Sequence, residues 1–172
     1  MGQAITQQTF SAEEHQRFAE RMERCVDALG ALAERPGFGA GPLTIGAELE
    51  VNLIDEQARP APCASAVLAQ TADPRLTHEV NRFNLELNCR PLPLGGASLS
   101  GLAAELAGGL AELRRAAAGA GARVVTVGIL PSILPEDLGP AALTDLPRYH
   151  ALNRALRERH SGPFGEIGRA HV

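Results

Sequence analysis

Two stretches of the chain alternate between apolar and polar residues with a period of two, the pattern of a β-strand buried on one face. The first stretch runs from Leu43 to Leu53, and the second runs from Arg82 to Arg90. Successive side chains of a strand point to opposite faces, so the polar residues of each stretch share one face. These polar residues are Thr44, Gly46, Glu48, Glu50 and Asn52 in the first stretch, and Arg82, Asn84, Glu86, Asn88 and Arg90 in the second. The alternation predicts two strands, each with an apolar and a polar face.

Apolar residues recur at helical spacing in other parts of the chain. The first such segment opens with a Ser-x-x-Glu capping box at Ser11, and its apolar residues fall on one helical face. That face comprises Phe18, Met22, Cys25, Val26, Leu29 and Leu32. The predicted helices extend over Ser11 to Glu34, Ala64 to Leu68, from near Ser98 or Ser100 to Gly119, and from Asp145 onward with Pro147 in the first turn. Helices therefore alternate with strands along the chain.

A further stretch, Arg123 to Leu130, is apolar on both faces and ends at Pro131. A short run of this kind predicts a strand buried in the middle of a sheet. The two half-polar strands favour an antiparallel or mixed sheet with one face in contact with water. Together the elements predict an α+β fold whose sheet has one acidic face.

Composition and charge exclude several kinds of partner and chemistry. The formal net charge of -4 provides no basic surface for nucleic acid or anionic membranes. All basic residues are arginine, so the glycine-rich Gly37–Gly41 stretch lacks the lysine of a P-loop. The cysteines are far apart and the histidines lack zincin spacing, so any metal would be held by oxygen. Because no stretch has the length of a membrane span and no leader-like segment opens the chain, we expect a cytoplasmic protein.

Three glutamates on the two polar strand faces could bind a cation. Glu48 and Glu50 lie two positions apart on one strand, which separates their backbones by about 6.6 to 6.8 Å and lets both side chains reach one ion. Glu86 has the same chemistry on the second strand. If the strands are neighbours with aligned polar faces, the negative charge would be relieved by a divalent cation, and Mg²⁺ with substrate phosphates is the natural occupant.

A polar strand face that is simply solvated explains an isolated Glu-x-Glu more often than a metal site does. Two observations favour a site. No lysine or arginine lies between Leu43 and Asn52, and the glutamates are accompanied by asparagines that suit polar substrates as well as water, namely Asn52, Asn84 and Asn88. The residues alone indicate an acidic face and leave its occupant open.

Four segments resemble signatures of one known family, in the family's order. They are Thr44–Asp55, His78–Asn88, Val127–Pro131 and Pro147–Tyr149. They are similar to the second glutamate-cysteine ligase family, which includes carboxylate-amine ligases, and the resemblance spans roughly residues 1–161. Four ordered motifs are far more specific than one Glu-x-Glu. The resemblance implies a glutamine-synthetase-like catalytic fold, in which a curved, mainly antiparallel sheet presents carboxylates to Mg²⁺ and ATP while helices cover its back.

The resemblance also implies an activity. The enzyme would phosphorylate the side-chain carboxylate of glutamate with ATP, and the amine of cysteine would displace the phosphate to give γ-glutamylcysteine, the first step of glutathione biosynthesis. ATP, glutamate and cysteine are the expected partners, Mg²⁺ is the expected cofactor, and oligomerisation stays open. Two alternatives remain. One is a carboxylate-amine ligase with another amine substrate, and the other is a non-catalytic metal-binding or oligomerisation module.

The resemblance assigns roles to particular residues. The expected catalytic residues and metal ligands are Glu48, Glu50 and Glu86, with Glu79 as a further metal ligand, and the expected substrate-binding residues are Asn84, Asn88 and Arg148. On one continuous strand the parity of Glu79 would place it with Phe83 and Leu85, on the apolar face, unless the strand begins later or contains a bulge. Arg148 could bind a carboxylate or phosphate, or support the start of a helix.

Members of that family are considerably longer than this chain. We therefore expect residues 1–165 to be the N-terminal part of one catalytic domain, and this fragment to be inactive alone. Residues 166–172 resemble the translation of a sequencing-library adapter, so we expect them to be a non-native tail.

Overall fold

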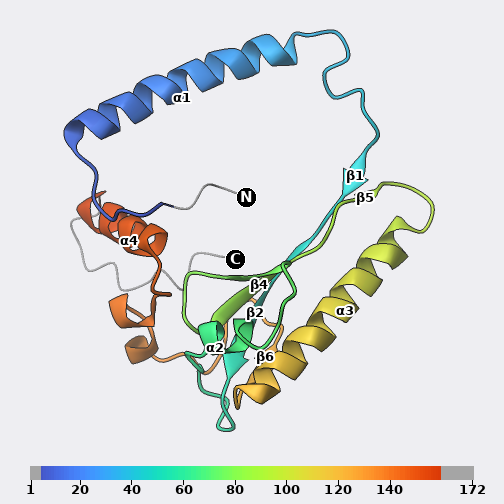
Figure 1. The fold of residues 1–172 in the computed structure, drawn as a ribbon, viewed down its shortest axis with the longest axis vertical. Coiled ribbons are helices and arrows are strands. Elements are labelled where there is room, and N and C mark those ends of the chain that lie inside the picture. Colours follow the sequence, from blue (N-terminus) through green and yellow to red (C-terminus); the bar gives the residue numbers. More distant parts are fainter. Residues whose placement is uncertain (1–4, 160–172) are drawn as a thin grey trace.

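The computed structural model describes residues 5–159, which form helices and two antiparallel sheets (Figure 1). The helices are α1 (Ala12–Ala33), α2 (Ala64–Leu68), α3 (Ser98–Gly119) and α4 (Pro147–Arg159), with short 3₁₀ turns at Pro135–Asp137 and Pro140–Ala142. The strands are β1 (Thr44–Ile45), β2 (Glu48–Ile54), β3 (Leu76–His78), β4 (Asn84–Asn88), β5 (Leu92–Pro93) and β6 (Arg123–Val125). This arrangement confirms the α+β prediction. The tail predicted at residues 166–172 lies outside the described residues.

The main sheet has the strand order β3-β4-β2-β6, and all of its pairings are antiparallel. The first predicted strand is interrupted at Gly46 and Ala47, so that β1 pairs with β5 while β2 pairs with β4. Cys89 N donates to Ala47 O across this interruption at 2.8 Å. The two strand pairs thus follow one another along a single ribbon, which Figure 1 shows rising from the sheet toward β1 and β5.

Helices α2 and α3 cover the apolar face of the sheet. Leu85 and Leu87 of β4 are fully buried, as is Leu113 of α3. The core cluster comprises Val51, Leu53, Ala64, Val67, Leu76, Leu85, Leu87, Leu113, Ala116, Ala117 and Ala122. Each large aliphatic side chain buried in this way stabilises the fold by about 1.5–3 kcal/mol. The predicted apolar strand faces therefore form the core, and the polar faces lie on the other side of the sheet.

The second predicted strand is shorter than the sequence pattern suggests and is preceded by another. β4 covers Asn84–Asn88, and β3 pairs with it in antiparallel register, so that Thr77 lies opposite Glu86. A turn through Glu79 to Phe83 joins the two strands, and Arg82 N donates to Ala142 O instead of to a strand. The prediction that Arg82 and Arg90 belong to the strand is wrong, because Arg82 lies in the turn before β4 and the strand pairing with β2 ends at Asn88, before Arg90.

The prediction for Arg123 to Leu130 is wrong in both extent and position. β6 ends at Val125 and pairs only with β2 among the described strands, so it lies at an edge of the sheet. The chain then leaves the strand direction, and Val127 and Ile129 are 40% and 44% exposed. The side chain of Asn52 donates to Val127 O at 3.0 Å, which directs this carbonyl to a side chain instead of a neighbouring strand.

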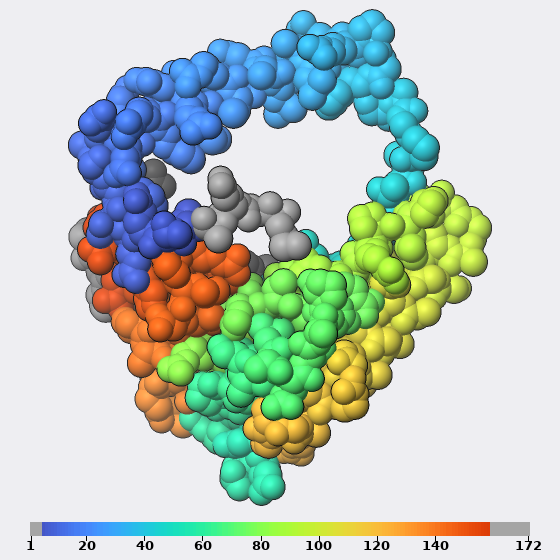
Figure 2. All heavy atoms as spheres, viewed as in Figure 1, coloured from blue at the N-terminus to red at the C-terminus, as the bar shows by residue number. Residues whose placement is uncertain are grey.

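Helix α1 has the predicted capping box. Ser11 Oγ accepts from Glu14 N at 3.2 Å, and Ser11 N donates to Glu14 Oε2 at 2.7 Å. No residue of α1 is buried, and Phe18 on its apolar face is 65% exposed. Figure 2 shows open space between α1 and the sheet. α1 therefore forms through local interactions.

In the described part of the chain, no helix is both long and apolar enough to cross a membrane.

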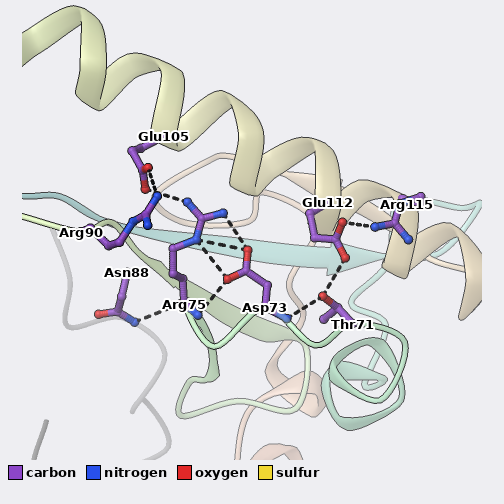
Figure 3. A network of polar contacts seen from close by, with 8 residues as sticks. All are labelled: Thr71, Asp73, Arg75, Asn88, Arg90, Glu105, Glu112 and Arg115. Carbon is purple, nitrogen blue, oxygen red and sulfur yellow. Dashed lines mark hydrogen bonds and ion pairs between the residues drawn. The ribbon is translucent and has the colours of Figure 1, made fainter.

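An ion-pair network joins α3 to the strand edge (Figure 3). Arg75 binds Asp73 at 2.7 Å and Glu105 of α3 at 2.8 Å, and Arg90 binds the same glutamate at 2.6 Å. The hydrogen bond from Arg75 lowers the pKa of the Asp73 carboxyl. Thr71 Oγ1 donates to Glu112 of α3 at 2.7 Å in the same region. These contacts hold the turn before β3 against α3.

Candidate functional site

The register of β2 and β4 aligns the polar residues of the two strands. Glu50 lies directly opposite Glu86, and Glu48 lies opposite Asn88. Residues paired in this way share a face, with Cβ atoms about 4.5–5.5 Å apart. The strand pairing therefore places two of the predicted carboxylates side by side on the face that α2 and α3 leave uncovered.

Glu79 approaches this acidic face from the turn between β3 and β4. Burial raises the pKa of its carboxyl, and the nearby carboxylates of Glu50 and Glu86 raise it further. Thr144 fixes the turn, because its Oγ1 donates to Glu79 O at 2.6 Å and its N donates to Val80 O at 2.8 Å. β4 begins only at Asn84, after the chain has reversed direction, so the later start that would free Glu79 from the apolar face is the one observed.

A cavity lies beside Glu50 and Glu79. Its lining combines carboxylates and amides with an apolar wall from the segment after β6. The lining residues are Glu50, Asn52, Glu79, Val80, Asn81, Phe83, Asn84, Gly128, Ile129, Leu130 and Ile133. A concave site with a few convergent polar groups is the usual form of a small-molecule site. Glu48, Glu86, Asn88 and Arg148 do not line it.

The predicted asparagines have different environments. Asn84 Nδ2 donates to Asn52 Oδ1 at 2.8 Å, and Asn52 Nδ2 in turn donates to Val127 O. Asn88 Nδ2 has longer contacts, 3.4 Å to Thr77 Oγ1 and 3.5 Å to Arg75 O. Asn52 was absent from the predicted site residues, although its place beside Glu50 on the polar face was visible in the alternation. The alternation does not reveal that Asn52 is buried, with only 5% of its surface exposed.

Arg148 lies in the first turn of α4, as predicted. Its Nη2 donates to His78 O at 3.2 Å and to the Tyr149 hydroxyl, and its Cζ lies 4.5 Å from the centre of the Tyr149 ring. The Tyr149 hydroxyl also donates to His78 O, at 3.1 Å. The charge of Arg148 counteracts the rise in the pKa of Glu79. Arg148 therefore anchors α4 to the end of β3 and places a positive charge near the acidic face.

The donor set suits a hard cation, but the side chains do not converge on one point. Carboxylate and amide oxygens are typical ligands of Mg²⁺. Within residues 5–159, no three side chains of His, Cys, Asp or Glu come close enough to hold a metal ion between them. Metal binding by Glu48, Glu50, Glu79 and Glu86 stays a prediction, and it requires these side chains to turn toward one another.

A comparison with protein families decides the family. The sequence model of glutamate-cysteine ligase family 2 (GCS2) matches residues 44–169. The chain belongs to this family. The GCS2 match begins at β1 and includes every strand, the acidic face and Arg148, while α1 precedes it. GCS2 is a ligase family, and membership indicates ATP-dependent joining of a carboxylate to an amine. No curated protein and no solved structure matches the chain.

Proposed function

We propose that this GCS2 chain supplies the acidic face of an enzyme that joins the side-chain carboxylate of glutamate to the amine of cysteine, with ATP as co-substrate. The observation that supports this most is the pairing of Glu50 with Glu86 next to Glu79, inside the region that the family matches. The product would be γ-glutamylcysteine, which is the first intermediate of glutathione biosynthesis.

In this proposal Glu48, Glu50, Glu79 and Glu86 hold Mg²⁺. Bound Mg²⁺ supplies neutralising charge for phosphate oxygens during phosphoryl transfer. The like charges of Glu50 and Glu86 face one another on neighbouring strands, which is unfavourable without a cation. The strand register thus keeps Glu50 and Glu86 on adjacent positions before any ligand arrives.

The other predicted residues would orient the substrates. Both hydrogen bonds of Arg148 to His78 and Tyr149 use the same nitrogen, Nη2. A guanidinium has five N–H donors, so the remaining ones can bind a carboxylate or phosphate oxygen. Asn84 and Asn88 lie on the same face of β4 as Glu86, where they would contact a polar substrate. Holding acid, amine and nucleotide together lowers the entropic cost of the reaction.

ATP drives the proposed reaction in two steps. A carboxylate oxygen of glutamate attacks the terminal phosphorus of ATP, and ADP leaves. The amine nitrogen then attacks the carbonyl carbon, a C–N bond forms, phosphate leaves with the two electrons of the C–O bond, and the nitrogen gives up a proton, which the leaving phosphate can accept. The same steps serve any amine, so the amine acceptor is the part of the proposal that needs a direct test.

The test is product analysis with the complete gene product that carries these residues. Glutamate and MgATP are incubated with cysteine or with a panel of other amines, and the products are identified by mass spectrometry. Formation of γ-glutamylcysteine with cysteine preferred supports the proposal. Preference for another amine would assign the protein to a different carboxylate-amine ligation, and absence of ADP formation with every amine would favour a non-catalytic module.

A further inference from the structure

Asn52 lies at the centre of a buried chain of amide contacts. Its Oδ1 accepts from Asn84 Nδ2 at 2.8 Å, and its Nδ2 donates to Val127 O at 3.0 Å. The residue is 5% exposed, so these bonds are sheltered from competing water. One side chain thereby connects β4, β2 and the segment that follows β6.

The chain that follows the segment Val127–Leu130 is attached by a separate set of contacts. Arg59 Nη1 donates to Ser132 O at 2.5 Å, and its Nη2 forms an ion pair with Asp137 at 2.6 Å. Leu130 is 5% exposed, and its carbonyl accepts from Ile133 N at 3.1 Å. The residues between these two attachments, Gly128 and Ile129, line the cavity.

We propose that Asn52 is a positioning residue, whose amide holds the Val127–Leu130 segment as one wall of the cavity that contains Glu50 and Glu79. The part that concerns ligand binding rests on the proposed function, in which Glu50 and Glu79 bind the metal of MgATP. Asn52 would then act on nucleotide binding through the position of the wall.

The amide is suited to this task because it donates and accepts at the same time. An aspartate of nearly the same shape keeps the acceptor for Asn84 but loses the donor for Val127 O. A leucine of similar volume loses both bonds. Comparing the two variants therefore separates the two hydrogen bonds: Asn52→Asp removes only the bond to the cavity wall, and Asn52→Leu also removes the bond to Asn84 within the sheet.

The first measurement is the backbone ¹⁵N order parameter of Gly128 and Ile129 in this chain. We expect values near about 0.85 in the native chain and below about 0.6 in both Asn52 variants. Val67→Ala is the control, because Val67 is fully buried in the core on the opposite face of the sheet and its truncation destabilises the fold without touching the wall. Order parameters that stay at the native value in both Asn52 variants would overturn the proposal.

The second measurement is the kinetics of the complete gene product with MgATP. We expect the KM for MgATP to rise about tenfold in Asn52→Asp while kcat changes by less than about threefold, and the KM to be unchanged in Val67→Ala. A mobile wall with unchanged KM would overturn the link to nucleotide binding. A native protein without ATP turnover would instead count against the proposed function, and the order parameters would still decide the structural part.

Discussion

The side chains of Glu50 and Glu86 place two negative charges on directly paired residues. Like charges in this position destabilise a sheet, and the effect of one cross-strand pair is about 0.2–1 kcal/mol. This pair lowers the stability of the fold when no cation is bound and raises it when both carboxylates share a cation. The stability of the chain should therefore depend on the metal.

We expect Glu86→Gln to raise the metal-free stability of the chain by about 0.2–1 kcal/mol, because it removes the repulsion with Glu50. Mg²⁺ should then stabilise the native chain more than the variant. Urea denaturation with and without Mg²⁺ measures both effects. Glu56→Gln is a matched control, since Glu56 is exposed in the turn after β2. A variant that gains as much stability from Mg²⁺ as the native chain would remove Glu86 from the metal site.

Individual site residues were predictable where the strand alternation reaches them. The parity of Glu48, Glu50 and Glu86 follows from the sequence because each lies within a paired strand. Glu79 does not follow this rule because it lies in a turn, where alternation carries no information about direction. The contacts of Asn52 with Val127 and of Arg148 with Tyr149 depend on segments far apart or on packing, and the pattern could not supply them.

Helix α3 packs closely on the sheet at Gly109. A Cβ on this residue would lie 2.5 Å from Leu87 Cδ2, whereas a Cβ on the neighbouring Gly108 would meet nothing within 4 Å. Leu87 is fully buried, so its side chain would have to shift within the core to make room for this Cβ. The two adjacent glycines therefore have opposite roles in the same helix.

We expect Gly108→Ala to stabilise the chain by about 0.5–1 kcal/mol, because alanine favours the helix. Gly109→Ala should destabilise it by about 1–3 kcal/mol, because the overpacked Leu87 must shift. Thermal denaturation of both variants measures the difference. Stabilisation by both substitutions would show that α3 does not pack on β4 as closely as described.

The capping box of α1 gives a second prediction for an element. Loss of the cap in Ser11→Ala should weaken helix formation by about 0.5–2 kcal/mol. Because no residue of α1 is buried, the loss should appear as faster amide hydrogen exchange in α1, with exchange in the sheet unchanged. Ser11→Asp retains the cap and is the control. Equal acceleration of exchange in α1 and β2 would mean that α1 is coupled to the core.

The elements were predictable to different degrees, and the reason is physical. Helices α1 and α3 follow from the spacing of their apolar residues, which is local, and only α1 among these helices begins with a side-chain cap, whereas α2 and α3 have none. β6 was placed in the middle of the sheet because its residues are apolar on both sides, but the partner of a strand is decided by the rest of the fold. The interruption at Gly46 and the added strand β3 likewise depend on register, which local pattern does not fix.

At the scale of the whole molecule, the sheet has helices on one face and carboxylates on the other. The ion pairs of Arg75 with Asp73 and Glu105 hold the covered side together. The pKa of Asp73 is lowered by the hydrogen bond from Arg75. A carboxyl whose pKa is lower in the folded than in the unfolded state stabilises the fold above the unfolded pKa, here 3.8, and loses this effect as pH falls through the folded value.

We therefore expect Asp73→Asn to be less stable than the native chain at neutral pH, with the difference shrinking below pH about 3.8 and vanishing once both states are protonated. Urea denaturation over a pH series measures the difference. Glu56→Gln again serves as control. A difference that is constant across the acid range would show that Asp73 contributes through its shape and not through its charge.

The most direct test of the account is the rate of glutamate- and amine-dependent ADP formation by the complete gene product, compared between the native protein, Glu50→Gln and Glu56→Gln over a range of Mg²⁺ concentrations. Binding of catalytic Mg²⁺ by the acidic face predicts that Glu50→Gln loses most of its turnover while keeping the native fold, and that Glu56→Gln retains it. Native turnover in Glu50→Gln at every Mg²⁺ concentration would contradict the account.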